Sequence, residues 1–262
     1  MNIIVCVKQV PASSNVKIDP VTGVLIRDGE NVKMNPFDLF ALEAAFYVNE
    51  RIKSNIHTVT MGPPSAKSVL LESLYMGADS GTLITDRKFA GADVLATAYT
   101  LGSAIAHLGN YDLVICGKQT TDGDTAQVGP EIAENLNIPH VPYVKEIIEV
   151  KEKSIVLRSA YDNYDEIVEV PYPLLITIEK DAFVPRLPSY RRKLEVKETC
   201  INTVTFRDLE DQNEANYGLK GSPTQVVSMF SPDKSIKTVV FEGNPDDVAK
   251  DLVKVLKDNQ FI

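Results

Sequence analysis

Residues 112–130 read DLVICGKQTTDGDTAQVGP, and in them a short apolar run is followed directly by a polar loop with three glycines. The run DLVIC is apolar almost throughout, which is typical of a strand covered on both faces of a parallel sheet. A helix is expected to begin near Val128 and to end before Pro139. The stretch therefore predicts a strand, a loop and a helix in succession, the repeating arrangement of α/β folds.

The remainder of the first 140 residues repeats this alternation. Short apolar runs at 2–7, 56–61 and 82–85 indicate further strands, and apolar residues recur at helical spacing over 38–52, 65–76 and 92–108. Asn35 and Pro36 are suited to the cap and the first turn of the first helix. We therefore expect an α/β fold with a doubly wound, mostly parallel sheet.

The pattern changes after residue 143. Four runs, at 144–150, 154–161, 166–170 and 174–178, indicate antiparallel strands, the last of which is expected to return to the main sheet. Residues 207–235 are polar and rich in turn residues, and an amphipathic helix is predicted over 245–259. The expected organisation is one α/β domain over 1–205, followed by an extended arm and helix over 206–262 that pack on another chain.

Composition excludes several classes of protein. No run of about 18 apolar residues is present to cross a bilayer, and the N-terminus lacks the pattern of a signal peptide, so a cytoplasmic location without membrane insertion is expected. A formal charge of -9 argues against nucleic acid as a partner. The three cysteines form no CxxC pair and do not suggest a disulfide framework.

The loop after residue 116 has the chemistry of a nucleotide site. The backbone N–H groups of residues 126–129 would lie at the start of a helix, where an anion is favoured, and Thr125 and Gln127 add neutral donors. Asp122 and Asp124 suit either helix capping or the hydroxyls of a sugar. Neither GxxxxGK[ST] nor GxGxxG is present, so a ligand-binding loop and a structural capping loop both remain open.

Other candidate residues favour structural roles. The three histidines are widely spaced without a metal-ligand rhythm, and no nucleophile, base and oxyanion donor can be assembled for hydrolytic chemistry. Asp162 and Asp165, together with Tyr161 and Tyr164, lie in a predicted hairpin turn, where solvated turn residues are favoured over a catalytic pair of carboxylates. A basic cluster in an acidic chain indicates either a docking surface or a solvated face, and consists of Arg186, Arg191, Arg192, Lys193 and Lys197.

Several motifs together resemble the β subunit of electron transfer flavoproteins. They are VCVKQVP at 5–11, MNPFD at 34–38, MGPPSA at 61–66, MGAD at 76–79 and the loop at 117–130, and the resemblance runs from residue 2 to at least residue 193. A second family signature is present as Arg158 followed by EIVEVPYPLLIT at 166–177. It departs from the family at Tyr161 and Asn163, where an acid and a glycine or acid are usual.

The resemblance implies a fold related to adenine nucleotide α hydrolases and a heterodimer with an α subunit that holds an FAD. In ordinary members the β subunit binds a structural AMP, whereas in electron-bifurcating members the same site holds a second FAD. Carried over by position, the residues implied for this site are Cys6, Asn35, Met61, Asp122, Gly123, Asp124, Thr125, Ala126, Gln127, Val128 and Gly129.

The form DGDTAQVGP is similar to that of the bifurcating group. It implies oxidation of NADH, with electrons passing to ferredoxin and, through the α-subunit FAD, to an acyl-CoA dehydrogenase. The loop implied to dock on the dehydrogenase consists of Ala182, Phe183, Val184, Pro185 and Arg186, with Phe183 as its apolar anchor. A β subunit with structural AMP is the alternative, and a nucleotide-binding stress-type module would leave the docking stretch and the C-terminal arm unexplained.

Overall fold

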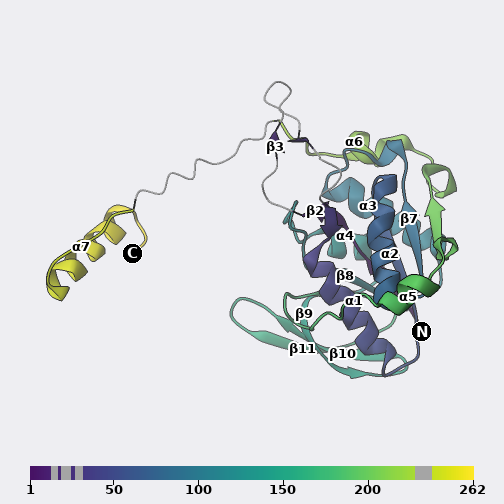
Figure 1. Ribbon diagram of the computed structural model, residues 1–262, viewed down its shortest axis with the longest axis horizontal. Helices are drawn as coiled ribbons and strands as arrows, with labels where there is room; N and C mark the ends of the chain where they lie inside the picture. The colour runs from purple at the N-terminus through teal and green to yellow at the C-terminus, as the bar shows by residue number, and fades with distance from the viewer. Residues whose placement is uncertain (13–16, 19–24, 27–31, 228–237) are drawn as a thin grey trace. The chain divides into compact units, whose positions relative to one another are not determined.

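A computed structural model describes residues 1–12, 17–18, 25–26, 32–227 and 238–262 (Figure 1). The chain divides into two compact units, Met1–Val227 and Ser228–Ile262. The first unit contains the sheet and the candidate site. Among the helices that the structure describes, none is both long enough and apolar enough to cross a membrane.

The first unit is built on a nine-stranded sheet in the order β11-β10-β9-β12-β8-β1-β6-β7-β13. All neighbouring strands from β9 to β13 in that order run parallel, while β10 pairs antiparallel with both β9 and β11. The strands are β1 (Asn2–Cys6), β6 (Asn55–Met61), β7 (Ser80–Ile84), β8 (Leu113–Gly117), β9 (His140–Val150), β10 (Ser154–Ala160), β11 (Asp165–Pro171), β12 (Leu174–Ile178) and β13 (Ile201–Val204). Two small pairs lie outside it, β2 (Gln9–Pro11) with β5 (Val32–Met34), and β3 (Lys17–Ile18) with β4 (Leu25–Ile26).

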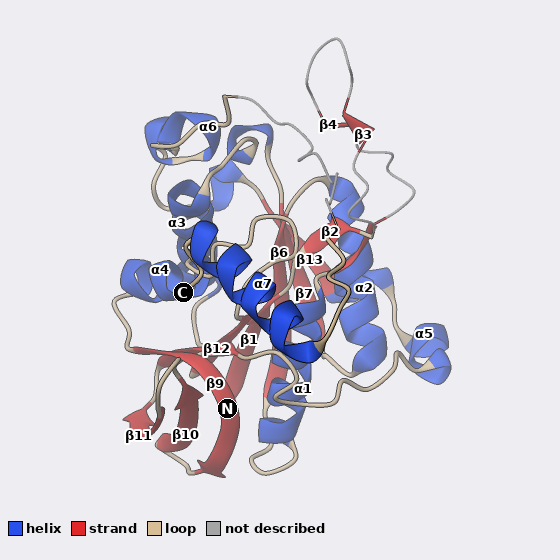
Figure 2. Ribbon diagram, turned by 90° about the vertical axis from the view of Figure 1, so that its left-hand side faces the viewer, coloured by secondary structure: helices blue, strands red, loops and turns tan. Residues whose placement is uncertain are grey.

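Helices cover both faces of the sheet, as the doubly wound prediction requires. Figure 2 shows α1 and α2 on one side of the strands and α3 and α4 on the other. The main helices are α1 (Pro36–Asn49), α2 (Lys67–Met76), α3 (Val94–Leu108) and α4 (Val128–Leu136), and two short ones are α5 (Tyr190–Glu195) and α6 (Gly218–Gly221). The predicted α/β fold with a mostly parallel sheet is confirmed.

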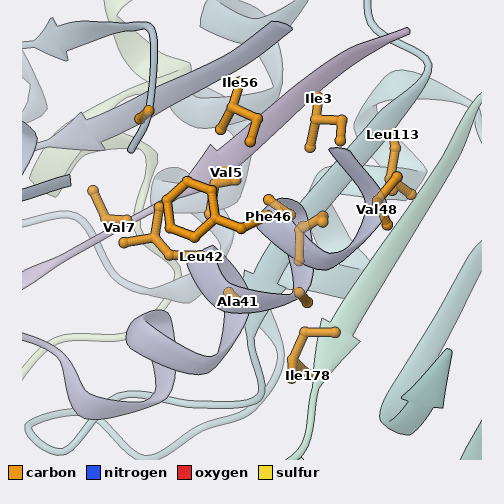
Figure 3. Close-up of a cluster of buried hydrophobic side chains, with 14 of the residues drawn as sticks. Ile3, Val5, Val7, Ala41, Leu42, Phe46, Val48, Ile56, Leu113 and Ile178 are labelled. Carbon is orange, nitrogen blue, oxygen red and sulfur yellow. The ribbon is translucent and has the colours of Figure 1, made fainter. Parts of the chain in front are cut away.

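The apolar core beneath α1 explains why the central strands are continuous apolar runs. Ile3 and Val5 of β1, with Leu42 of α1, are fully excluded from solvent (Figure 3). On the opposite face, Ile4 packs in a second cluster with α3 and α4. Alternate residues of one strand thus enter two different cores, and burying each such side chain contributes about 2 kcal/mol.

The antiparallel pairing predicted after residue 143 is confirmed for β9, β10 and β11, whereas β12 runs parallel to both of its neighbours. β12 returns to the main sheet between β8 and β9, as predicted. β9 begins at His140, before the expected start, because its first residues already pair with β12 through Leu175–His140 and Ile176–Val141. The hairpin of β10 and β11 extends the sheet at the β9 edge.

The residues after position 205 continue to pack on the first unit. Phe206, Leu209 and Tyr217 are buried in the core that faces α3, and the Tyr217 hydroxyl donates a hydrogen bond to the backbone oxygen of Asp211 at 2.9 Å. Four aromatic rings, those of Phe89, Tyr99, Phe206 and Tyr217, hold this segment on the first unit. The compact units divide between Val227 and Ser228.

The second unit contains the predicted C-terminal helix, α7 (Pro245–Asp258). Asn244 caps it by accepting a hydrogen bond from Asp247 N at 3.0 Å, and Asp246 and Asp247 occupy its first turn, where the helix dipole favours acids. Its apolar side chains Leu252, Val253 and Val255 are exposed within this unit.

The first turn of α1 buries a carboxyl group. Asp38 is 4% exposed, and its two oxygens accept hydrogen bonds from Asn35 Nδ2 at 2.8 Å and from Lys8 N at 2.7 Å. Burial raises the pKa of Asp38 from 3.8 to about 7, although both hydrogen bonds lower it. The folded chain therefore holds a proton on Asp38 at pH values where the unfolded chain has released it.

This raised pKa makes stability depend on pH. Between pH 3.8 and about 7 the folded chain binds more protons at Asp38 than the unfolded chain, so the free energy of unfolding should fall as pH rises through this interval. The loss from this residue is about 4 kcal/mol at most. Asp38→Asn removes the titrating group, and urea unfolding across this pH range should show a flatter profile for the variant.

Asp162→Asn is the matched control, because it changes the charge equally at an exposed position in a hairpin turn. Its profile should follow that of the unsubstituted chain. Equal slopes for Asp38→Asn and the unsubstituted chain would show that the carboxyl titrates at its ordinary pKa.

Candidate functional site

The order of the sheet reverses between β1 and β8. From β1 the chain proceeds outward through β6 and β7 to β13, whereas β8, β12 and β9 lie on the other side of β1. In doubly wound sheets, ligands bind at the carboxyl ends of the strands at such a reversal, because the two flanking loops diverge there. The loop at 118–127 follows β8 at this point, and the segment beginning at Val7 follows β1.

Asn35 links the segments that meet at the reversal. It is fully buried immediately before α1, where the sequence predicted a helix cap, but its side chain does not cap the helix. Nδ2 donates to Asp38 Oδ1 at 2.8 Å and to the backbone oxygen of Gln119 at 2.9 Å, and Oδ1 accepts from Thr121 N at 3.3 Å. One buried amide therefore fixes the beginning of the glycine-containing loop to α1.

The close approach of α1 requires glycine at position 117. A Cβ placed on Gly117 would lie 2.6 Å from Asp38 Oδ1 and 2.7 Å from the backbone carbon of Phe37. Both distances are shorter than the contacts that real Cβ atoms make. The Phe37 backbone, which is part of α1, cannot move away to make room for a side chain. The glycine that ends β8 thus allows Asp38 and Asn35 to reach the loop.

Two further contacts shape the loop itself. Lys8 Nζ forms an ion pair with Asp122 Oδ1 at 2.8 Å, and Gln119 Nε2 donates to Asp124 Oδ1. Partial burial raises the pKa of Asp122, but the hydrogen bond from Lys8 and the charge of its ammonium group lower it, and the net shift is downward. Both acids thus have partners within the protein, and the partner of Asp122 is a cation that stabilises its ionised form.

The loop ends at the start of α4 with its backbone donors directed outward from the helix. Asp124 and Ala126 have positive φ angles of 52° and 56°, which turn the chain sharply before the helix. The residue at the cap, Gln127, makes no side-chain cap hydrogen bond in the part of the chain that the structure describes. The first N–H groups of α4 are therefore available to an anion, reinforced by the helix dipole.

Gly129 allows this helix start to lie against the sheet. A Cβ at Gly129 would lie 2.6 Å from Thr177 Cγ2 of β12 and 3.6 Å from Cys116 Cβ of β8. The residues before it, 122–125 and 127, are exposed, and Ala126 is half-buried. The loop therefore offers exposed donors above a buried, closely packed floor.

The structure brings most of the predicted site residues to this edge. Cys6 at the end of β1, Met61 at the end of β6 and Val128 at the start of α4 are half-buried and pack against the same core cluster. Cys6 lies beside Cys116, which raises the pKa of the Cys116 thiol, as does burial. Both thiols are free, as expected from the sequence.

The sequence analysis did not assign an individual role at the site to three residues that the structure places there. Lys8 and Asp38 lie in the quoted motifs VCVKQVP and MNPFD, but no helical or strand periodicity distinguishes them from solvated charges. Lys118 pairs with Glu179 through Nζ and Oε2 at 2.8 Å, joining the loop to the end of β12. Two features of the sequence could have indicated these residues: Lys8 and Lys118 each follow a strand, and Asp38 lies in the first turn of a helix.

The predicted docking stretch, residues 182–186, is largely engaged within the chain. The half-buried Phe183 ring packs edge-on against Tyr47, with centroids 5.5 Å apart. Arg186 Nη2 pairs with Glu43 at 2.7 Å and with Glu50 at 3.1 Å. Four apolar side chains in this stretch and just after it are exposed. They are Val184 at 89%, Leu187 at 86%, Tyr190 at 74% and Leu194 at 71% exposure.

Comparison with known proteins identifies the family. A family model for the electron transfer flavoprotein domain matches residues 22–205. The chain is 46% identical to the electron transfer flavoprotein subunit beta of Thermoanaerobacterium thermosaccharolyticum and 43% identical to that of Clostridium acetobutylicum, with 100% of both chains covered in each case. It is 42% identical to the caffeyl-CoA reductase-Etf complex subunit CarD of Acetobacterium woodii, again over 100% of each chain. The chain therefore belongs to the electron transfer flavoprotein β-subunit family.

Proposed function

We propose that this chain is the β subunit of a cytoplasmic, electron-bifurcating electron transfer flavoprotein. In this proposal it pairs with an α subunit, binds FAD at the 118–129 loop and oxidises NADH. Electrons pass to ferredoxin and, through the α-subunit FAD, to an acyl-CoA dehydrogenase. The observation that carries the proposal is the helix start at Gln127–Gly129, where uncapped backbone donors lie at the reversal of the sheet.

The residues present fit a nucleotide. Gly129 leaves no room for a side chain between α4 and Thr177, so glycine at this position lets the start of α4, with its N–H groups, pack closely on the sheet. Thr125 and Gln127 are exposed beside these donors and can donate further hydrogen bonds. Asp122, bound by Lys8, and Asp124, bound by Gln119, are carboxylates whose remaining lone pairs suit sugar hydroxyls.

The flavin, when bound, would supply the redox chemistry by accepting a pair of electrons and releasing them singly. The chain's own residues bind and orient it. Asn35 and Asp38 hold the loop against α1, and Lys8 fixes the position of Asp122. None of these side chains is assigned as a general acid or base.

Support for a complex with an enzyme of acyl-CoA metabolism comes from a relative. The name of the CarD protein places it in a caffeyl-CoA reductase-Etf complex. By analogy, the acceptor of this chain would be an enzyme that reduces or oxidises an acyl-CoA. A β subunit that holds a structural AMP is the alternative function, because AMP and FAD share the phosphate and ribose that the loop fits.

Flavin content separates the two functions. The heterodimer, produced with its α subunit and denatured to release its nucleotides, is expected to yield two FAD per αβ pair and no AMP by chromatography. A yield of one FAD and one AMP would rule out bifurcation and support the structural alternative.

The loop donors can be tested without disturbing the core. Thr125→Ala with Gln127→Ala removes two exposed side-chain donors, and loss of two hydrogen bonds should weaken binding of the β-subunit nucleotide by about tenfold or more. Nucleotide occupancy after extensive dialysis is the measurement. The matched control is Thr199→Ala with Gln225→Ala, at exposed positions outside the loop, and should retain full occupancy. Unchanged occupancy in the loop variant would place the nucleotide elsewhere.

We propose that the acyl-CoA dehydrogenase docks on an apolar patch made of Val184, Leu187, Tyr190 and Leu194. These four side chains are exposed within a short segment, and single apolar anchors in such a patch contribute most of the energy of an interface. Phe183 and Arg186 would support the patch from below, through Tyr47 and Glu43.

Substitution of the patch should affect electron transfer but not flavin binding. Leu187→Asp places a charge in the proposed interface and is expected to slow reduction or oxidation of the dehydrogenase by about tenfold or more at limiting concentrations. Ile167→Asp, at a position 55% exposed on the hairpin, is the control. Equal rates for both variants would exclude this patch as the docking surface.

The second unit would contribute to the heterodimer. Five apolar side chains are exposed within this unit: Leu252, Val253 and Val255 of α7, and Phe261 and Ile262 after it. The opposite face of α7 carries acidic and basic residues. We propose that this apolar stripe packs on the α subunit, where burial would offset the exposure.

A further inference from the structure

Three tyrosines form a continuous stack beside the candidate site. The rings of Tyr161 and Tyr164 are stacked, with centroids 5.0 Å apart and an interplanar angle of 21°, and Tyr143 meets Tyr161 edge-on at 6.1 Å. Tyr143 lies in β9, while Tyr161 and Tyr164 flank the turn between β10 and β11. Tyr164 is 61% exposed, so the outer end of the stack is open to solvent.

The inner end of the stack joins the nucleotide loop. Lys118, the first residue after β8, places Nζ 4.9 Å from the centroid of the Tyr143 ring. Tyr143 N donates to Thr177 Oγ1 at 3.0 Å, and Thr177 is the residue that packs against Gly129 at the start of α4. The tyrosines and the backbone donors of α4 are therefore connected through one threonine.

The backbone at Tyr143 is held in an uncommon conformation. Its φ angle is 55°, in the left-handed region that disfavours residues other than glycine by about 1–2 kcal/mol. The hydrogen bond to Thr177 and the cation above the ring retain it. The direction of the innermost ring is thus fixed by the same residues that border the loop.

The hairpin does not require this stack. β10 and β11 pair along their whole length, from Ser154–Pro171 to Ala160–Asp165, and the turn is closed by a hydrogen bond from Tyr161 N to Tyr164 O at 2.9 Å. An aromatic ring between two others is therefore not a need of the turn.

We propose that the Tyr143–Tyr161–Tyr164 stack is a subsite for the second planar ring of the nucleotide bound at the loop, the ring that FAD has and AMP lacks. The inference rests on the proposed nucleotide site and adds its ring-binding surface. The stack extends from Tyr143, which contacts Thr177 and Lys118, to Tyr164, the exposed ring at its other end. Aromatic side chains bind planar rings of nucleotides in this way in many proteins.

The test compares FAD with AMP on the heterodimer. With the α-subunit flavin in place, the emptied β-subunit site is titrated with each nucleotide by calorimetry. Tyr164→Leu should weaken FAD binding by about tenfold or more, as expected for one lost stacking partner, and leave AMP binding unchanged. Tyr164→Phe keeps the ring and should retain the affinity for FAD.

Ile167→Ala is the control for the hairpin, because it is exposed on β11 and outside the stack. It should bind both nucleotides as the unsubstituted chain does. Fluorescence gives a second measurement, since stacking on tyrosine quenches flavin emission, and emission from the β-subunit flavin should rise in Tyr164→Leu only.

Each other outcome overturns the subsite. Equal weakening of FAD and AMP in Tyr164→Leu would show that the stack only supports the loop, and unchanged binding of both would show that no ring lies there. If Tyr164→Leu no longer bound the α subunit but still bound both nucleotides, the stack would be a surface that contacts the α subunit and not a ring subsite. If the unsubstituted heterodimer binds neither nucleotide at this site, the proposed function itself fails.

Discussion

The contact between Asn35 and Asp38 is the interaction on which the site depends. A buried carboxyl group accepts one N–H group from the segment after β1 and another from the residue before α1, while the Asn35 amide reaches the loop after β8. Three segments that are distant in sequence are thereby joined beneath the reversal of the sheet. Gly117 is the condition for this contact, since any side chain there would occupy the position of Asp38.

The sequence was sufficient for the sheet and its covering helices because their signals are local. Apolar runs such as Ile3–Val5 are buried on both faces, and α3 ends at Gly109 as its pattern indicates. The polar composition after residue 205 does not indicate the aromatic contacts of Phe206 and Tyr217, whose partners Phe89 and Tyr99 are more than a hundred residues away in the sequence. Long-range aromatic contacts leave no periodic signal.

The sequence predicted where the candidate site lies, but it predicted only some of the contacts that form the site. The loop at 117–130 could be assigned from its place after a strand, and the family resemblance added Asn35. The roles of Lys8 and Asp38 depend on how two loops fold onto each other, which spacing does not reveal. For the same reason the sequence did not reveal that the Phe183 ring packs edge-on against Tyr47 of α1.

The positive φ angles of Asp124 and Ala126 have a consequence for how this loop can change over time. A left-handed alanine disfavours folding by about 1–2 kcal/mol relative to glycine at the same place, so random substitution toward Gly at 126 would be accepted by the fold. Such a drift would also loosen the chain just before its helix donors. Replacing Ala126 by glycine would therefore raise the stability of the fold and, at the same time, lower the rigidity of the loop just before α4.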